Sequence, residues 1–111
     1  MLRLKFQRIA DELNAYGIGV MLVGEDGLPI FSTYGGDELA AMCSVIAFTA
    51  EKSMSELGKE LNYVVVSSSD GGIVITKLTS SYLALIYPTN EKLGLTLFFM
   101  RKLKRELGET F

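Results

Sequence analysis

Two segments of this chain are apolar on both of the sides that a strand presents, and this feature constrains the fold most. Residues 18–23 read IGVMLV and residues 82–87 read YLALIY. Successive residues of a strand point to opposite faces of its sheet, so strands of this kind must be covered on both faces. The sequence therefore predicts a central sheet that lies between helices.

Helical periodicity and turn residues divide the chain, residues 1–111, into one α+β domain. An amphipathic first helix ends near Gly17, and a second helix runs from Asp37 to about Leu57. The expected strands span residues 18–23, 28–34, 62–67, 73–78 and 82–87, and a last helix spans about 91–107. The predicted order is α-β-β-α-β-β-β-α, with a five-stranded, largely antiparallel sheet.

Two strands are expected at the edges of this sheet. Pro29 stands early in the second strand, and because proline has no N–H to donate, that strand should be an edge. Residues 63–66 read Tyr-Val-Val-Val without proline or charge, and we expect them at the opposite edge. Such an edge readily pairs with another chain. Antiparallel pairing of two copies would cover it, so the sequence favours a homodimer.

The second helix has no charged residue from position 39 to position 50. Its expected core-facing stripe comprises Leu39, Cys43, Ile46, Ala50, Met54 and Leu57. Ala41, Val45 and Phe48 fall on the opposite side and lead to Lys52. A helix that is apolar all round is buried all round, either within one protomer or against a partner, and the small domain favours a partner. The methionines expected as core filler are Met21, Met42, Met54 and Met100.

The residue types that most catalytic and metal sites need are missing. The chain has no His, and its one Cys, Cys43, excludes an internal disulfide and a thiolate zinc site. No P-loop motif occurs, and Gly17-Ile18-Gly19 precedes a strand instead of following one, unlike a dinucleotide fingerprint. The serines of residues 67–69 have no imidazole to activate them. We therefore expect a protein that is not an enzyme, without metal or cofactor.

The net charge of −2 argues against a nucleic-acid partner. Basic residues nevertheless gather on the first and third helices. If these helices share one face of the sheet, that face is basic through Arg3, Arg8, Arg101, Lys104 and Arg105. Residues 101–105 are then either a solvated surface that complements the negative end of the last helix, or a docking site for an anionic membrane or an acidic protein.

Neither a membrane span nor a targeting segment is expected. The longest uncharged run, residues 78–90, is shorter than the ~18 residues that a spanning helix needs. The N-terminus MLRLKFQRIADEL lacks an apolar signal core. Together with the single cysteine, this favours a cytoplasmic protein whose mature chain begins at Met1.

Several segments recur in a known family: a strand that ends in Asp26-Gly27 before an apolar strand, a hairpin around residues 70–72, and Asn90 with Leu93-Gly94 before the last helix. With the uncharged second helix, they make nearly the whole chain resemble the Roadblock (dynein light-chain) family. Longin and profilin-like domains have related architectures. The resemblance implies a homodimer, or a pseudo-symmetric heterodimer, joined through the third strand and the second helix.

The resemblance also implies a non-catalytic regulator of Ras-like small GTPases, or a scaffold for motor and signalling complexes. In bacterial polarity systems, a Roadblock dimer binds one GTPase over its paired second helices and stimulates hydrolysis without inserting an arginine. The second helix here has no Arg. The GTPase contacts expected are Ala41, Val45, Phe48 and Lys52, and the dimer contacts are Tyr63, Val64, Val65, Val66, Ser67, Met42, Val45 and Thr49. The alternative function is a scaffold that tethers a complex to an anionic membrane through the basic helices.

Overall fold

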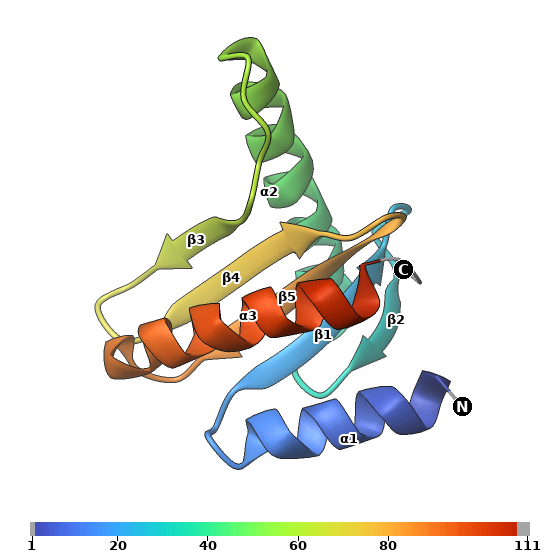
Figure 1. Ribbon diagram of the computed structural model, residues 1–111, viewed down its shortest axis with the longest axis vertical. Helices are drawn as coiled ribbons and strands as arrows, with labels where there is room; N and C mark the ends of the chain where they lie inside the picture. Colours follow the sequence, from blue (N-terminus) through green and yellow to red (C-terminus); the bar gives the residue numbers. More distant parts are fainter. Residues whose placement is uncertain (1, 109–111) are drawn as a thin grey trace.

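The computed structural model describes residues 2–108, with side chains from residue 4 onward, and places helices on both faces of one sheet (Figure 1). The elements are α1 (Leu2–Asn14), β1 (Gly19–Gly24), β2 (Pro29–Ser32), α2 (Asp37–Glu56), β3 (Val64–Ser67), β4 (Gly72–Lys77), β5 (Ser81–Tyr87), a short 3-10 helix η1 (Asn90–Lys92) and α3 (Leu93–Leu107). The predicted order and fold class are confirmed, and η1 is the one addition.

The sheet has the strand order β2-β1-β5-β4-β3, and every neighbouring pair is antiparallel. The strand that begins with Pro29 therefore lies at one edge and β3 at the other, as the sequence predicts. Strand β5 runs through the middle, where it pairs with β1 on one side and β4 on the other. This central position explains why β5 is apolar at nearly every residue.

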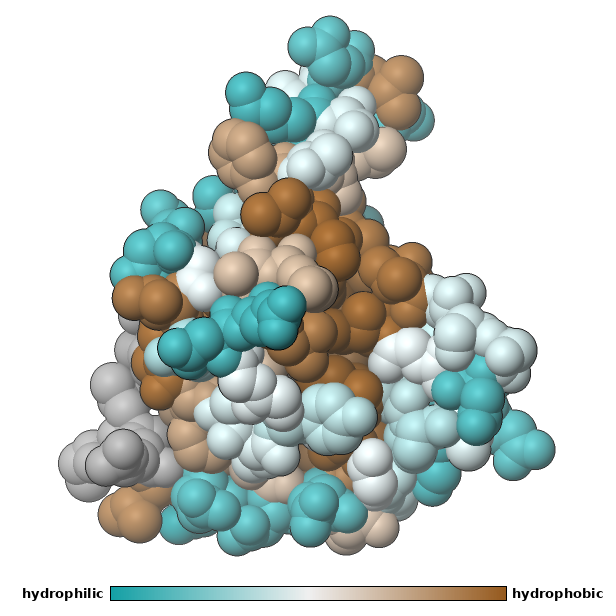
Figure 2. All heavy atoms as spheres, turned by 180° about the vertical axis from the view of Figure 1, so that it is seen from behind, coloured by the Kyte–Doolittle hydropathy of each residue, from teal (hydrophilic) through white to brown (hydrophobic). Residues whose placement is uncertain are grey.

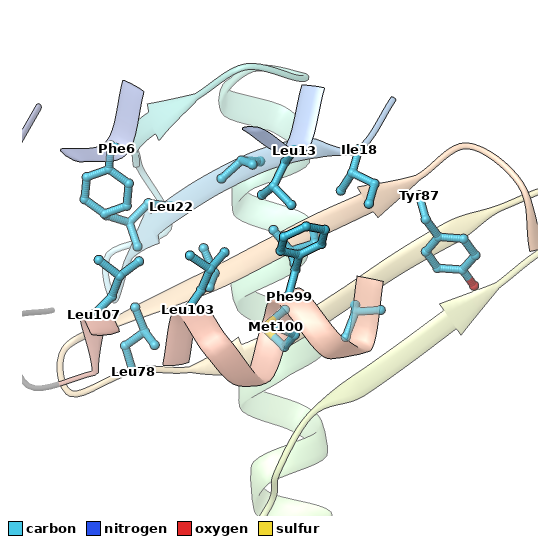
Figure 3. Close-up of a cluster of buried hydrophobic side chains, with 14 residues drawn as sticks. Phe6, Leu13, Ile18, Leu22, Leu78, Tyr87, Phe99, Met100, Leu103 and Leu107 are labelled. Carbon is cyan, nitrogen blue, oxygen red and sulfur yellow. The ribbon is translucent and has the colours of Figure 1, made fainter. Parts of the chain in front are cut away.

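Helices α1 and α3 cover one face of the sheet and enclose the larger core (Figure 3). Its buried residues are Phe6, Leu13, Ile18, Val20, Leu22, Val74, Leu78, Leu83, Leu85, Tyr87, Phe99, Met100, Leu103 and Leu107. Burial of a large apolar side chain stabilises the folded state by about 1.5–3 kcal/mol. This cluster therefore dominates the stability of the domain.

Within residues 2–108, α2 is the one helix that packs on the other face. Its buried residues are Ala40, Cys43 and Ala47, a row of small side chains that lets the helix backbone approach the sheet closely. The expected core-facing stripe is only partly right, because Leu39 and Ile46 are half-buried flanks of this row. Leu57 is 64% exposed, since the end of α2 projects beyond the sheet (Figure 1).

The methionines divide between the core and the surface. Met21 and Met100 are buried as expected, and Met54 is half-buried. Met42 is 52% exposed, so its assignment to the core is wrong. One residue of α-helix turns the side chain by about 100°, so the position next to buried Cys43 lies on a flank of the helix and not against the sheet.

No α-helix within residues 2–108 is both long and apolar enough to span a lipid bilayer.

Candidate interaction surface

The outward side of α2 carries a row of exposed residues, which we call the α2 row. Ala41, Val45, Phe48 and Lys52 follow one another at helical spacing, and all are exposed. Val45 is 63% exposed and Phe48 52% exposed, which is high for side chains of this size. The Lys52 ammonium lies 5.3 Å from the centre of the Phe48 ring, a cation–π distance. The row therefore presents an apolar strip that ends in a positive charge.

One flank of α2 is closed by neighbouring parts of the chain. Gly27, in the β1–β2 turn, has φ +83, and a Cβ atom there would lie 3.2 Å from Ser44 Oγ. Farther along the helix, the Glu51 carboxylate lies 3.5 Å from Lys77 Nζ of β4. These contacts leave little room for a partner on this flank.

The opposite flank of α2, which carries Met42 and Thr49, is open. A hollow of about 380 Å³ lies on this part of the sheet, and its lining includes Leu39, Ile73 and Ile86. Figure 2 shows hydrophobic residues gathered in the middle of this face, below the projecting end of α2. Neither Ile73 nor Ile86 is among the residues expected at this surface, because strands apolar on both sides predict complete cover by helices.

The free edge of β3 borders the same surface. Val64 is paired with Ile75 and Val66 with Ile73, which places both valines on the face that α2 covers. Val66 is 42% exposed, and Val65, on the other face, is 38% exposed. Among residues 2–108, β4 is the one strand that pairs with β3.

The ends of the predicted third strand differ in environment. Ser67 is exposed at the C-terminal end of β3. Tyr63 lies just before the strand, which is shorter than the predicted 62–67, and packs against the core under α1 and α3. The expected dimer residues thus fall on two faces: Met42, Val64 and Val66 lie on the α2 side, and Tyr63 lies on the other.

The polar residues around the β3–β4 turn hold the turn together. The Ser68 hydroxyl donates to the Gly71 carbonyl (2.9 Å) and accepts from the Asp70 amide (3.0 Å). The Asn90 side chain accepts from the Gly71 amide at 3.1 Å and donates to the Ser69 carbonyl at 3.2 Å. These bonds fix the hairpin against η1.

The described residues contain no cluster of His, Cys, Asp or Glu that could hold a metal ion. Cys43 is buried against the sheet, and burial raises the pKa of its thiol. Burial likewise raises the pKa of the Tyr82 hydroxyl, although the Lys77 charge opposes this effect. Groups held neutral in this way are poor nucleophiles.

The basic residues share the α1/α3 face, as the sequence predicts, but acidic residues divide them. Lys102 Nζ lies 3.8 Å from the Glu12 carboxylate, and both residues line a shallow groove with Arg8 and Glu106. Arg101, Lys104 and Arg105 lie together along another groove, between α3 and the segment that leads into β3. The side chain of Arg3 lies outside the described part of the structure.

Comparison with known proteins gives a family and a fold. The model of the Roadblock/LC7 domain matches residues 8–87. MglB of Myxococcus xanthus is 20% identical, with a TM-score of 0.76, and the match covers 92% of this chain and 80% of that chain. A Roadblock/LC7 domain from Streptomyces avermitilis is 17% identical, with a TM-score of 0.71 and coverage of 92% and 96%. A structure described as MglB with tetrameric arrangement is 15% identical, with a TM-score of 0.71 and coverage of 92% and 86%.

No curated protein matched this chain. At these identities the solved structures establish the arrangement of the backbone. The family match is independent of them and extends from α1 to the end of β5. It also decides between the related architectures that the sequence leaves open. The chain belongs to the Roadblock/LC7 domain family.

Proposed function

We propose that this protein is a homodimeric, non-catalytic regulator of a Ras-like small GTPase. Membership of the Roadblock/LC7 family supports this class of function. The observation that carries the proposal is the exposed apolar row of α2 beside an open sheet edge. Contiguous apolar surface of this kind marks a protein–protein interaction site.

In the proposed dimer, β3 pairs antiparallel with β3 of a second copy. Pairing supplies partners for the backbone groups along this edge and makes one continuous sheet from two. The open flank of each α2, with Met42 and Thr49, then approaches the partner together with Val64 and Val66. These contacts add the apolar area that a stable interface requires, about 1,200–2,000 Å² in total.

The GTPase is assigned to the α2 row, which faces away from the sheet. Residues 41, 48 and 52 lie about 60–120° around the helix from Met42 and Thr49 of the open flank, and Val45 lies between the two sets. A dimer and a GTPase can therefore use α2 together. Since α2 carries no Arg, any acceleration of hydrolysis comes from ordering of the GTPase's own catalytic residues.

A matched pair of substitutions tests the proposal. Phe48→Asp places a charge in the α2 row, and Met42→Asp places the same charge on the open flank. We expect Phe48→Asp to abolish stimulation of a Ras-like GTPase in single-turnover hydrolysis while the dimer persists. We expect Met42→Asp to weaken the dimer, measured by sedimentation. If both variants remain dimeric and stimulate hydrolysis normally, the assignment of these surfaces is wrong.

A further inference from the structure

A groove of about 660 Å³ lies on the face of the sheet opposite α2. It separates α3 from the segment that leads into β3. Arg101, Lys104 and Arg105 bring three positive charges to its lining, and Tyr63 and Phe98 bring two aromatic rings. We call it the α3 groove.

The walls of the α3 groove are fixed by one backbone carbonyl. The carbonyl oxygen of Asn62 accepts a bond from Thr76 Oγ1 at 2.6 Å and another from Lys104 Nζ at 3.3 Å. These bonds tie the segment before β3 to β4 and to α3. The cationic side chains therefore project from a support that is already in place, which reduces the entropic cost of binding a ligand.

An exposed aromatic ring lies beside the charges. Phe98, Arg101 and Arg105 recur at the spacing i, i+3 and i+7, so they share one stripe of α3. Phe98 is 57% exposed, although the next residue, Phe99, is buried in the core. Apolar area left in water at the mouth of a groove is gained as binding energy when a ligand covers it.

The charge of the α3 groove is not neutralised from within. Among the residues that the structure describes, no carboxylate lines it. The ion pairs between described side chains join Lys77 to Glu51 and Lys102 to Glu12, so they do not involve the cations of the groove. Guanidinium groups bind carboxylates through two parallel hydrogen bonds, which favours a partner that carries carboxylates.

We propose that the α3 groove binds an acidic peptide segment of a partner protein. Carboxylates of the segment pair with Arg101 and Arg105, and one large apolar side chain lies between Tyr63 and Phe98. The concave shape suits a peptide. A flat anionic bilayer that approaches the α1/α3 face would also meet the exposed carboxylates of Glu12 and Glu106. This proposal is independent of GTPase binding, because α2 lies on the other side of the sheet.

The test uses the whole chain labelled with nitrogen-15 and a short peptide with Leu-Phe between glutamates. We expect titration to shift the amide signals of residues around Phe98 and Arg101. Combined Arg101→Glu and Arg105→Glu should weaken binding by about a hundredfold, since each of the two lost charge-assisted bonds is worth about tenfold. The control is Lys5→Glu with Arg8→Glu on α1, the same charge change, which should leave binding nearly unchanged.

Two further measurements make the test of the α3 groove decisive. A peptide with lysines in place of glutamates should not bind, and this holds even if the double variant fails to fold. Phe98→Ser should weaken the Leu-Phe peptide but not an Ala-Ala version. The proposal is overturned if shifts map to α2, if the folded double variant binds normally, or if phosphatidylserine vesicles bind the protein and the acidic peptide does not.

Discussion

Small side chains on α2 determine how the rest of that helix is presented. Ala40, Cys43 and Ala47 are the buried row, whereas the sequence pattern points to larger residues such as Ile46 and Leu57. Periodicity predicts which side of a helix is apolar. It does not predict the point at which a helix extends beyond the edge of the sheet, so the exposure of Leu57 could not be predicted from the sequence.

The close approach of α2 predicts that this row tolerates no added volume. Ala47→Leu should lower the free energy of unfolding by about 1–3 kcal/mol, because overpacking displaces the helix from the sheet. Urea denaturation at one protein concentration measures this effect. The same change in side-chain size at exposed Ser55, Ser55→Leu, should be nearly neutral, and equal losses at both positions would contradict the packing described.

Because Cys43 is buried, we expect its thiol to react slowly with alkylating reagents. Burial raises the pKa of this thiol, so the thiolate, which is the reactive form, is scarcer in the folded protein than in the unfolded chain. Reaction with iodoacetamide at pH 8 should be several-fold slower in native protein than in urea, followed by mass spectrometry. Equal rates in both conditions would show that the α2 face is open at this point.

At the scale of elements, the edges of the sheet were predictable because they depend on local chemistry. Pro29 cannot donate to a ladder, and it marks β2 as an edge in the structure. The uncharged valines of β3 mark the other edge. The sequence did not predict that Ile73 and Ile86 lie beside an open hollow. They are left without a covering helix because the single helix α2 is too narrow for a five-stranded sheet.

Proline substitutions in β3 test its role as a pairing edge. Backbone N–H groups alternate between the two sides of a strand, so Val65→Pro and Val66→Pro differ in which ladder they interrupt. The variant in which proline replaces a residue whose N–H group bonds to β4 should lose stability, because that hydrogen bond is removed. The other should retain its circular dichroism spectrum but become a monomer by light scattering, with a melting temperature that no longer depends on protein concentration. A dimer from both folded variants would rule out pairing through β3.

At the scale of the whole molecule, the two faces of the sheet differ in what they leave exposed. Beneath α1 and α3 lies the larger core, and the surface above it carries charges of both signs. The α2 face is incompletely covered and apolar. Both the layered fold and the family could be predicted from the sequence, since they depend on patterns spread along the chain. The α3 groove could not, because it brings together residues 62–63, 76 and 98–105.

Self-association predicts that stability depends on protein concentration. A dimer that binds only folded chains shifts the unfolding equilibrium by mass action. The melting temperature should therefore rise as concentration increases from about 1 μM to 100 μM, a range around typical dissociation constants. Scanning calorimetry measures this shift. A constant melting temperature, with a monomeric mass at every concentration, would exclude the homodimer.

The two borders of the sheet differ chemically, and this difference limits how many copies of the chain can join by strand pairing. One border, β3, can accept a neighbouring strand, whereas the opposite border begins with a residue that has no amide hydrogen to offer. Once two molecules have joined through their receptive borders, each outer rim of the shared sheet is proline-bearing β2. In the proposed dimer, assembly by strand addition therefore ends with the closed pair and makes no fibre.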